Sequence, residues 1–555
     1  MKKLKLVFVL IISGYILVLL SLLRIQFFTT NYSDNADYIK KSIIPAKRGI
    51  IYDANGEILA GSSINYDISV DPQFFKPVEN DIGKIADLLS VDVASIEARL
   101  KAGAPRWASL AIAVPTEKYL AMKALGFAGV YGEQRLQRVY PEASLSGTLT
   151  GFVGNDAEGK QIGYYGLEGY YESELKGLEG FYAGERDLSY RPMFFGYQDR
   201  LESQDGRDLY LTIDKSVQQI VKNVAVKGMN LHKPKEICII VANPNTMAIL
   251  GLTCLPDYDP TNYGQFPDAN YRNSAISDLY EPGSTFKPIV VATALEAKVI
   301  KPTEILPESG PVKVGDSLVR TWDNKYRGTI SVAETLAKSS NVGMVEIGKK
   351  LGDDQIFSLL MRYGFESETG IDLQGEVSNI VRPRADWYPI DYATITFGQG
   401  LAVTPIQLLT AFASVINGGE LLRPYVVAKM SDGVKTSEHS PKIVIRRVIS
   451  ESNSLVMRKM LEYTVEHAEY RWQKPVGYKF GGKTGTAQIA MAGNYDKSKT
   501  IASFIGFTPV DKPRFIALVI LKEPSSSEWG SETAAPLFFE LAKEMILYYN
   551  IPPEY

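Results

Sequence analysis

The hydrophobic pattern begins with one long apolar segment close to the N-terminus. Residues Leu6 to Leu23 carry no charge, and small residues are the main interruptions. At about 1.5 Å per residue, a helix of this length spans about 27 Å of a hydrocarbon layer about 30 Å thick. Three lysines precede the segment and only Arg24 closely follows it. Because cytoplasmic flanks carry the excess of positive charge, we expect residues 1–5 in the cytoplasm, a single-pass transmembrane anchor over 6–23 and the remaining chain outside.

A cleaved secretory signal is the alternative interpretation of this segment. The stretch ends in Arg24-Ile25-Gln26-Phe27-Phe28, which lacks a small-x-small cleavage pattern, and its apolar run exceeds the usual signal core. These features favour an uncleaved anchor in the cell (inner) membrane, with the bulk of the chain extracytoplasmic or periplasmic.

Beyond the anchor the pattern changes twice. Residues 45 to about 230 mix short β-rich pieces with glycine turns, and Asn55-Gly56 indicates a tight hairpin. From residue 208 onward the spacing over Lys215 to Met229 is helical, a strand pair follows, and several helical stretches precede strands near the C-terminus. The whole indicates an α+β fold. We place a domain boundary in the polar stretch Glu202 to Gly206, which gives domains of 24–205 and 206–555.

The only two cysteines flank the predicted strand pair. Cys238 and Cys254 lie in apolar runs on either side of Asn243-Pro244-Asn245-Thr246, a turn signal. Closing that turn tightly pairs position 238 with 251 and leaves Cys254 on the opposite face of the sheet. A disulfide is therefore possible only in another register.

Composition excludes several functions. Lys plus Arg number 60 and Asp plus Glu 63, so the net charge of -3 lacks the basic footprint of nucleic-acid binding. With 555 residues and 45% apolar content, the chain has room for two large or three to four smaller folded domains. The three histidines, His232, His439 and His467, are not clustered with each other or with the cysteines, so we expect no metal, no cofactor and no histidine-dependent triad.

A candidate nucleophile follows a Pro-Gly breaker in Glu281-Pro282-Gly283-Ser284-Thr285-Phe286-Lys287. If a helix begins there, Ser284 and Lys287 lie one turn apart on the same face. Lys287 can act as the base only if burial and a second cation depress its pKa, because an ordinary lysine is protonated. The S-x-x-K pattern alone is not specific, since Ser173 to Lys176 also matches and is most simply a solvated helix face.

Two further motifs follow in a fixed order. They are Lys338-Ser339-Ser340-Asn341 and Phe480-Gly481-Gly482-Lys483-Thr484-Gly485-Thr486-Ala487. The three motifs together match the serine, S-x-N and K-T-G set of penicillin-binding proteins and serine β-lactamases. A literal S-D-N at Ser33 to Asn35 precedes the serine and lies near the membrane segment, so we interpret it as a polar turn.

Each motif residue has a physical role in acyl transfer through a serine ester. The hydroxyl of Ser339 can pass protons between Lys287 and a leaving amine, and Asn341 can hydrogen-bond a substrate amide. Lys483 supplies positive charge for a substrate carboxylate and keeps Lys287 from holding its proton.

The remaining groups of the third motif can bind the substrate. Thr484 and Thr486 offer hydroxyls, and Gly485 permits close approach of an extended peptide. The backbone N–H groups of Ser284 and Thr486 are the natural oxyanion donors. Taken singly, Ser339 to Asn341 could merely cap a helix and Gly481-Gly482 could form a bulge in an edge strand.

A phosphate-binding loop competes for the third motif. Residues Gly477 to Thr484 satisfy G-x-x-x-x-G-K-T. That loop requires a buried strand before it and a helix after it, whereas Pro475 interrupts the first and Gly485 lies where the helix would start. We therefore treat the match as a coincidence.

Longer stretches resemble class B penicillin-binding proteins, the monofunctional peptidoglycan D,D-transpeptidases. The resemblance covers nearly the whole chain and is carried by the following stretches: Arg48-Gly49-Ile50-Ile51-Tyr52-Asp53, Asn55 to Ala60, Arg138-Val139-Tyr140-Pro141, Gly166-Leu167-Glu168, Arg272 to Asp278, Phe397-Gly398-Gln399-Gly400 and Thr404-Pro405-Ile406-Gln407. The resemblance implies a pedestal (dimerisation-type) domain joined to a transpeptidase domain with a five-stranded antiparallel sheet covered by helices.

The resemblance also implies a reaction and partners. A donor stem peptide ending in D-Ala-D-Ala would acylate Ser284, lose its terminal D-Ala and be aminolysed by a neighbouring strand, and β-lactams would acylate the same serine and deacylate slowly. The usual partner is a polytopic glycosyltransferase of the shape, elongation, division and sporulation (SEDS) family, contacted through the anchor and pedestal. Length and motif wording favour the division or sporulation branch over rod elongation.

Three rival functions remain open at this stage. A serine β-lactamase would need a second base, and no Glu-x-x-x-Asn lies between Asn341 and Lys483. A membrane-bound β-lactam receptor would normally carry several spans and a cytoplasmic effector. A non-enzymatic cell-wall scaffold would tolerate Ser284→Ala.

Overall fold

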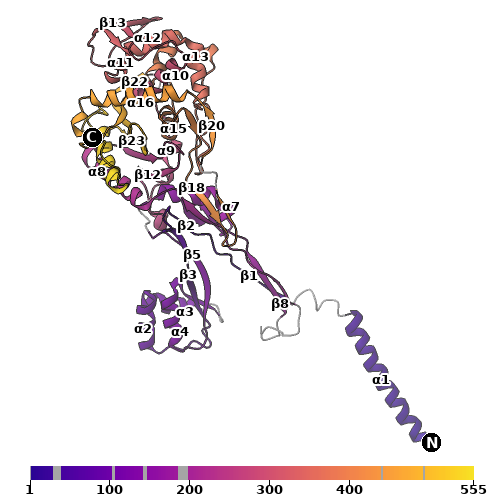
Figure 1. Cartoon of the computed structure of the whole chain (residues 1–555). Coiled ribbons are helices and arrows are strands. Elements are labelled where there is room, and N and C mark those ends of the chain that lie inside the picture. The colour runs from indigo at the N-terminus through magenta and orange to yellow at the C-terminus, as the bar shows by residue number, and fades with distance from the viewer. Residues whose placement is uncertain are drawn as a thin grey trace. The chain divides into compact units, whose positions relative to one another are not determined.

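The computed structural model describes residues 2–28, 39–102, 107–141, 145, 147–185, 198–438, 442–491 and 494–554 (Figure 1). The chain divides into two compact units, Met1–Lys47 with Gly177–Asp205 and Arg48–Lys176 with Gly206–Tyr555. Ser33 to Asn35 and His439 lie outside the described residues.

The first unit contains the predicted anchor. Helix α1 (Lys2–Phe28) has exposed apolar side chains, and its segment Val7–Arg24 is long and apolar enough to cross a membrane. The unit also contains an antiparallel sheet in the order β1 (Ile39–Ile44), β8 (Gly180–Glu185) and β9 (Gln198–Leu201). The N-terminal apolar helix fits a single-pass anchor.

The second unit begins with a seven-stranded sheet in the order β19-β18-β10-β2-β3-β4, with β5 also pairing with β3. Strand β10, which follows the polar stretch ending at Gly206, pairs in parallel with β2 and antiparallel with β18. The predicted Asn55-Gly56 hairpin is confirmed, because β2 and β3 pair antiparallel around it. The elements of this region are β2 (Ile51–Tyr52), β3 (Ile58–Val70), α2 (Glu79–Leu89), α3 (Val93–Ala102), β4 (Ala108–Pro115), α4 (Thr116–Ala124), β5 (Val130–Val139), α5 (Gly147–Thr150), β6 (Phe152–Asn155), β7 (Gln161–Tyr164), α6 (Gly166–Tyr170), α7 (Glu172–Leu175), β10 (Asp208–Leu211), β18 (Val427–Ser431) and β19 (Thr436–Glu438).

A buried ion network joins three stretches that are far apart in the sequence. The carboxylate of Glu168 is fully buried and accepts hydrogen bonds from Arg48 and Arg138, each at 2.6 Å. Burial alone would raise the pKa of Glu168, but the two guanidinium charges outweigh it and hold the pKa below its usual value. The stretches around Arg48, Arg138 and Glu168 that carry the family resemblance therefore meet at one point.

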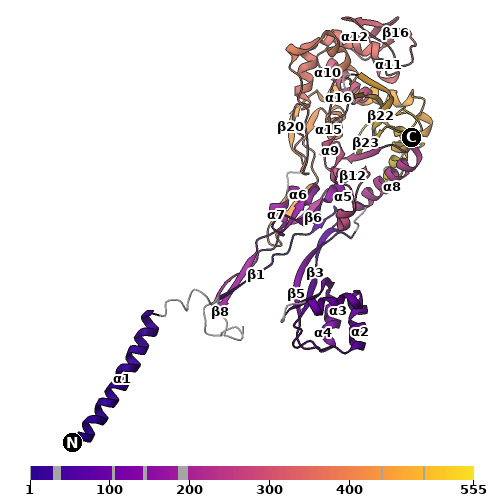
Figure 2. The same ribbon diagram turned by 180° about the vertical axis from the view of Figure 1, so that it is seen from behind.

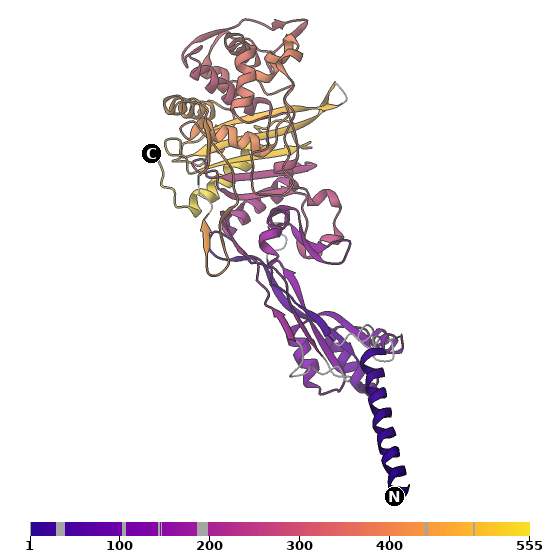
Figure 3. The same cartoon turned by 90° about the vertical axis from the view of Figure 1, so that its right-hand side faces the viewer.

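The C-terminal part of the second unit, from α8 onward, contains a five-stranded antiparallel sheet, as the resemblance implies. The strand order is β12-β11-β23-β22-β21 (Figure 3). Alternate residues of β11 pack into two cores: Ile237 and Ile239 pack with α8 and α17, whereas Cys238 and Ile240 pack with α9, α10 and α15. Helices therefore cover both faces of the sheet, and β12 and β21 are its two edge strands. The elements are α8 (Lys215–His232), β11 (Glu236–Ala242), β12 (Ile249–Leu255), α9 (Ser274–Ser277), α10 (Lys287–Glu296), α15 (Pro405–Ile416), β21 (Gly481–Met491), β22 (Asn494–Thr508), β23 (Phe515–Lys522) and α17 (Ala534–Tyr548).

Helices, short strands and 3-10 turns make up the rest of the second unit. Local capping fixes several starts: the side chain of Asp214 accepts a hydrogen bond from Ser216 N at the start of α8, and Thr404 and Gln407 form a capping box on α15. The other elements are η1 (Pro260–Gln265), η2 (Asp268–Tyr271), η3 (Gly283–Phe286), β13 (Ile305–Glu308), β14 (Val312–Val314), β15 (Ser317–Val319), β16 (Gly328–Ser331), α11 (Val332–Ala337), α12 (Asn341–Leu351), α13 (Asp353–Arg362), η4 (Arg384–Asp386), α14 (Pro389–Thr396), β17 (Glu420–Leu422), β20 (Val444–Arg447), α16 (Glu451–Glu466) and η5 (Arg471–Gln473).

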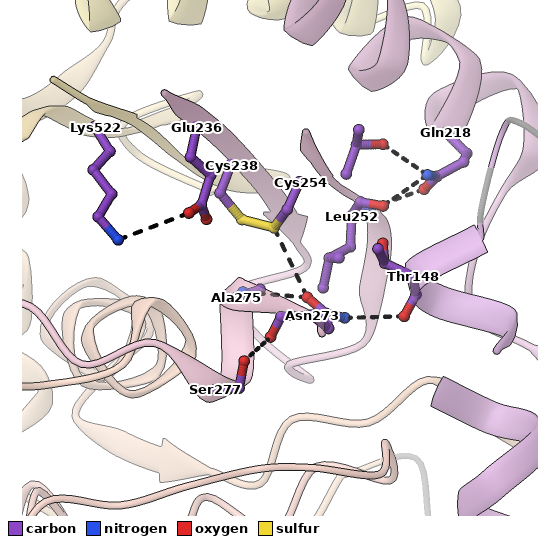
Figure 4. The surroundings of a disulfide bond; sticks show 11 residues. Thr148, Gln218, Glu236, Cys238, Leu252, Cys254, Asn273, Ala275, Ser277 and Lys522 are labelled. Carbon is purple, nitrogen blue, oxygen red and sulfur yellow. Dashed lines mark hydrogen bonds and ion pairs between the residues drawn. A yellow bond between two sulfur atoms is a disulfide. The ribbon is translucent and has the colours of Figure 1, made fainter. Parts of the chain in front are cut away.

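The β11–β12 hairpin corrects the tight-turn prediction. Cys238 lies opposite Cys254, not opposite Gly251, and the two sulfurs form a disulfide (Figure 4). The chain makes a wider turn, because the N–H of Asn243 bonds to the carbonyl of Ala248, and a bulge shifts the register at Ala242. Both cysteines therefore share one face of the sheet.

Candidate active site

The nucleophile turn is held between a loop and the edge strand. Gly283 has φ +57°, a conformation that favours glycine, and its N–H bonds to the carbonyl of Gly398 at 2.9 Å. The turn η3 leads directly into α10, so Ser284 and Lys287 lie one turn apart, as the sequence predicts. Ser284 is half-buried and Lys287 is fully buried.

The amine of Lys287 is at the centre of the first two motifs. It donates hydrogen bonds to the carbonyl of Ser339 at 2.7 Å, to the Ser339 hydroxyl at 3.1 Å and to Oδ1 of Asn341 at 2.8 Å. The hydroxyl of Ser339 donates to Oγ of Ser284 at 2.9 Å. A continuous hydrogen-bonded chain thus runs from the lysine through Ser339 to the candidate nucleophile.

The S-x-N motif occupies the short loop between α11 and α12. Ser339 has φ +54°, which is uncommon for a residue with a side chain and marks a position held by its surroundings. Ser340 caps α12, accepting from the N–H of Gly343 at 3.0 Å. The capping role considered for this motif is therefore real, and it coexists with the contacts to Lys287.

The third motif lies on β21. Lys483 is buried, and its amine donates to the carbonyl of Thr484 at 3.1 Å. A Cβ added at Gly283 would lie 3.3 Å from the carbonyl oxygen of Thr486, so the nucleophile turn lies against this part of the strand. A Cβ at Gly485 would lie 3.0 Å from the carbonyl oxygen of Pro282. The glycine thus permits the close approach of the turn itself.

The strand also decides between the alternatives for this motif. Residues 481–491 form β21, so no helix follows Lys483 and the phosphate-loop interpretation is excluded. Gly481 and Gly482 pair regularly with β22, and the bulge of this strand lies at Gln488/Ile489 instead. A Cβ at Gly481 would lie 2.3 Å from the ring of Phe507, which explains why this position lacks a side chain.

Burial and mutual repulsion tune the two lysines. Burial lowers the pKa of Lys287 well below its ordinary value, and the positive charge of Lys483 lowers it further. Burial lowers the pKa of Lys483 to about 7. The site can therefore hold an uncharged amine beside the serine while a second lysine retains part of its charge near neutral pH.

The structure separates the decoy from the site. Ser173 and Lys176 are exposed on and just beyond α7, as expected for a solvated helix face. The other predicted residues, from Ser284 and Lys287 to Ser339 and Asn341, converge as described.

Sequence reasoning missed several residues around the motifs. The indole N–H of Trp322 donates to the carbonyl of Lys338 at 3.2 Å, and its ring packs on Trp529 with centroids 5.4 Å apart. The N–H of Gly530 donates to the hydroxyl of Thr486 at 3.2 Å. These residues lie in irregular segments without periodicity or motif, so no sequence signal singled them out.

A cavity of about 350 Å³ lies against one face of the sheet and is lined by residues of β11, β21, β22 and β23. Glu281, three residues before Ser284, lines it together with Gln488 and Ile489, which follow Thr486 on the strand. Because a strand rises about 3.3 Å per residue, Gln488 lies about 7 Å beyond Thr486. The cavity therefore borders β21 about two residues beyond Thr486.

Comparison with known proteins identifies the family. The family model described as "Penicillin binding protein transpeptidase domain" matches residues 237–543, and that of the "Penicillin-binding Protein dimerisation domain" matches residues 43–211. The chain belongs to the penicillin-binding protein transpeptidases. Since the dimerisation domain precedes the transpeptidase domain, it is a class B member.

Individual relatives agree with this assignment. The chain is 33% identical over 514 residues to stage V sporulation protein D of Bacillus subtilis, covering 91% of this chain and 79% of the relative. It is 28% identical to the probable peptidoglycan D,D-transpeptidase PenA of Neisseria gonorrhoeae, covering 93% and 87%. The crystal structure of penicillin-binding protein 2X from Streptococcus thermophilus superposes with a TM-score of 0.78 at 26% identity, covering 92% and 80%.

Proposed function

We propose that this protein is a peptidoglycan D,D-transpeptidase that works through an acyl-enzyme on Ser284. The observation that carries the proposal is the hydrogen-bonded chain from the buried amine of Lys287 through Ser339 to Ser284. When the amine is uncharged it keeps two hydrogens for the carbonyl of Ser339 and for Asn341, and its lone pair can accept a hydrogen bond from the Ser339 hydroxyl, which in turn can take the proton of Ser284. The site residues proposed are the ones that the three motifs supply.

The donor half-reaction follows from the placement of these groups. Oγ of Ser284 attacks the carbonyl of the penultimate D-Ala, and its proton passes through the Ser339 hydroxyl to the uncharged amine of Lys287. The backbone N–H groups of Ser284 and Thr486 stabilise the oxyanion. As the peptide bond breaks, the Ser339 hydroxyl relays a proton to the departing amine of the terminal D-Ala, which leaves an ester on Ser284.

Substrate binding uses the edge strand. Lys483 and the hydroxyl of Thr484 bind the terminal carboxylate, Thr486 adds a hydroxyl, and Asn341 hydrogen-bonds a peptide amide. The preceding residues of the stem peptide would then extend past Gln488 towards the cavity. In the second half-reaction the amine of a neighbouring stem peptide attacks the ester, forms the cross-link and releases Ser284. A β-lactam would occupy the same groups and deacylate slowly.

The organisation of the whole chain is part of the proposal. We assign residues 1–5 to the cytoplasm, 6–23 to the anchor, 24–205 to the pedestal and 206–555 to the transpeptidase domain outside the membrane. Anchor and pedestal would contact a polytopic SEDS-family glycosyltransferase and other cell-wall synthesis proteins. Division or sporulation is the favoured setting.

A penicillin adduct tests the proposal directly. The full chain in detergent is incubated with benzylpenicillin, and intact-mass spectrometry followed by peptide mapping should find one adduct on Ser284. Ser284→Ala should abolish it, whereas Ser173→Ala, in the exposed S-x-x-K decoy, should leave it unchanged. An adduct elsewhere, or none on folded protein, would refute the assignment.

Turnover and product analysis separate the rival functions. With a stem peptide ending in D-Ala-D-Ala and an amine acceptor, the protein should release D-Ala and form the cross-linked product. Rapid turnover of nitrocefin would instead indicate a β-lactamase. Full complementation by Ser284→Ala in cells would indicate a scaffold.

A further inference from the structure

The middle residue of the S-x-N motif points away from the catalytic groups. Ser339 and Asn341 both contact the amine of Lys287, whereas the side chain of Ser340, between them, is 1% exposed and donates its hydroxyl hydrogen to Glu308. The same hydroxyl accepts from the N–H of Gly343, and the N–H of Ser340 bonds to the carbonyl of Thr335. Both the hydroxyl and the backbone N–H of Ser340 are thus hydrogen-bonded to other protein groups.

Glu308 is an unusual partner, because it is a fully buried carboxylate. It ends β13 and is 0% exposed. One oxygen accepts from Ser340, and the other accepts from the backbone N–H of Arg327 at 3.3 Å and from its guanidinium at 3.2 Å. Burying a charged group costs free energy unless the group is paired and hydrogen-bonded. Ser340 and Arg327 supply the hydrogen bonds and the opposite charge that the buried carboxylate of Glu308 needs.

The elements that bring these partners together lie side by side. Strands β13 and β16 form a two-stranded antiparallel sheet in which Glu308 faces Gly328, and α11 follows β16 directly. In Figure 2, β16, α11 and α12 lie together at one end of the second unit, next to α10. Through Glu308, this two-stranded sheet contacts Ser340 in the loop that carries the motif, while Lys287 contacts Ser339 and Asn341.

This support has a consequence for catalysis. The loop consists of Lys338, Ser339 and Ser340, and Ser339 adopts a left-handed conformation that a side chain rarely adopts. Such a conformation persists only where the surroundings impose it. Ser340 is hydrogen-bonded to Glu308, whereas its two neighbours, Ser339 and Asn341, contact Lys287.

We propose that Glu308 is a positioning residue for acyl transfer, which acts through Ser340 to hold Ser339 and Asn341 against Lys287. It touches neither substrate nor reacting atoms. The proposal rests on the acyl-enzyme function proposed above and adds a residue outside the three motifs. Arg327 holds the second oxygen of the Glu308 carboxylate through its backbone N–H and its guanidinium.

Substitution of the carboxylate by an amide gives the first test. Glu308→Gln removes one acceptor, so either Ser340 or Arg327 loses a hydrogen bond. In the full chain in detergent, we expect the rate constant of acylation by benzylpenicillin to fall by about 100-fold, as for a small misplacement of catalytic groups. The dissociation constant of the complex before acylation should change less than the acylation rate constant, because the carboxylate-binding groups on β21 stay in place while Asn341 is loosened.

A matched control uses the same substitution nearby. Glu304 precedes β13 and pairs with Lys350, away from the motif. Glu304→Gln should acylate like the wild type. All rates are expressed per active site, counted by the stoichiometry of the penicillin adduct. If Glu308→Gln merely lowers the number of active sites, or acylates at the wild-type rate, the proposal is wrong.

Moving the carboxylate from position 308 to position 340 gives a test that a purely structural role would not pass. Ser340→Asp places two carboxylates together and should abolish acylation. Adding Glu308→Gln restores one acid and one donor, so the double variant should acylate at least tenfold faster than Ser340→Asp alone. No recovery would overturn the proposal. Lack of acylation in the wild type would refute the proposed function instead.

Discussion

At the scale of single residues, the decisive feature is the pair of buried lysines. Burial and the nearby charge of Lys483 hold the pKa of Lys287 well below its ordinary value, and burial lowers the pKa of Lys483 to about 7. The two amines therefore need opposite protonation states to work: Lys287 neutral as the base, and Lys483 charged to attract a carboxylate.

The pH dependence of acylation should report both groups. The second-order rate constant for a carboxylate-bearing β-lactam should rise with pH as Lys287 loses its proton, with a midpoint well below pH 10.5. It should fall above about pH 7 as free Lys483 becomes neutral. Stopped-flow acylation across the pH range measures both limbs.

Lys483→Ala separates the two limbs. Without the second cation, the pKa of Lys287 should increase, so the rising limb should move to higher pH and the falling limb should disappear. Acylation should also slow at neutral pH because the carboxylate loses its partner. A profile with an unchanged rising limb would contradict both roles.

Much of this site could be predicted at the residue scale, but not its supports. Ser284, Lys287 and Lys483 belong to motifs whose order is specific, and the chemistry dictates that they meet. The contact of Ser340 with Glu308 joins residues that lie 32 positions apart in the sequence, with strands β14 to β16 and helix α11 between them. Neither periodicity nor local spacing encodes such a contact.

At the scale of elements, the nucleophile turn is positioned by close backbone contact with a loop. Gly398 lies so near that an added Cβ would be 2.0 Å from the carbonyl oxygen of Gly283, and Gly398 itself has φ +79°. The resemblance marked this loop by its sequence. The structure supplies the reason, since only glycine fits against the turn.

Gly398→Ala should therefore displace the nucleophile without touching it. We expect acylation to fall by about 100-fold or more, because shifts of about 1 Å at reacting atoms cost that much. Gly264→Ala is the control, since an added Cβ there meets nothing within 4 Å. Wild-type acylation by Gly398→Ala would show that the turn does not depend on this contact.

Element types were easier to predict than their register. The helix after Asp214 and the hairpin at Asn55-Gly56 follow from local signals, and both are present. The β11–β12 register was wrong because the turn is widened by Met247 in a left-handed conformation, which no residue preference announces. One wider turn changes which side chains face each other across the whole hairpin.

At the scale of the whole molecule, the proposed catalytic groups all belong to the second unit, whereas the apolar helix belongs to the first. We therefore expect membrane anchoring and acyl transfer to depend on different parts of the chain. The sequence could predict this division because hydrophobic length is a local property. It could not predict that strands around residues 51, 209 and 429 share one sheet, since that depends on tertiary pairing.

Removal of residues 1–28 should release the protein from membranes without loss of chemistry. The shortened chain should partition into the aqueous phase in detergent phase separation and be acylated by penicillin at the wild-type rate per active site. Retention in the membrane phase would reveal a second attachment surface, and loss of acylation would show that the helix supports the site.

The bond between Cys238 and Cys254 limits where this protein can be made in its finished form. Such a crosslink persists only in oxidising surroundings, so a chain held in a reducing cytosol would keep two thiols inside its central sheet. Formation of this disulfide requires an electron acceptor in the compartment where the chain folds. Recombinant preparations from cytosol and from periplasm are, for this reason, chemically different starting materials.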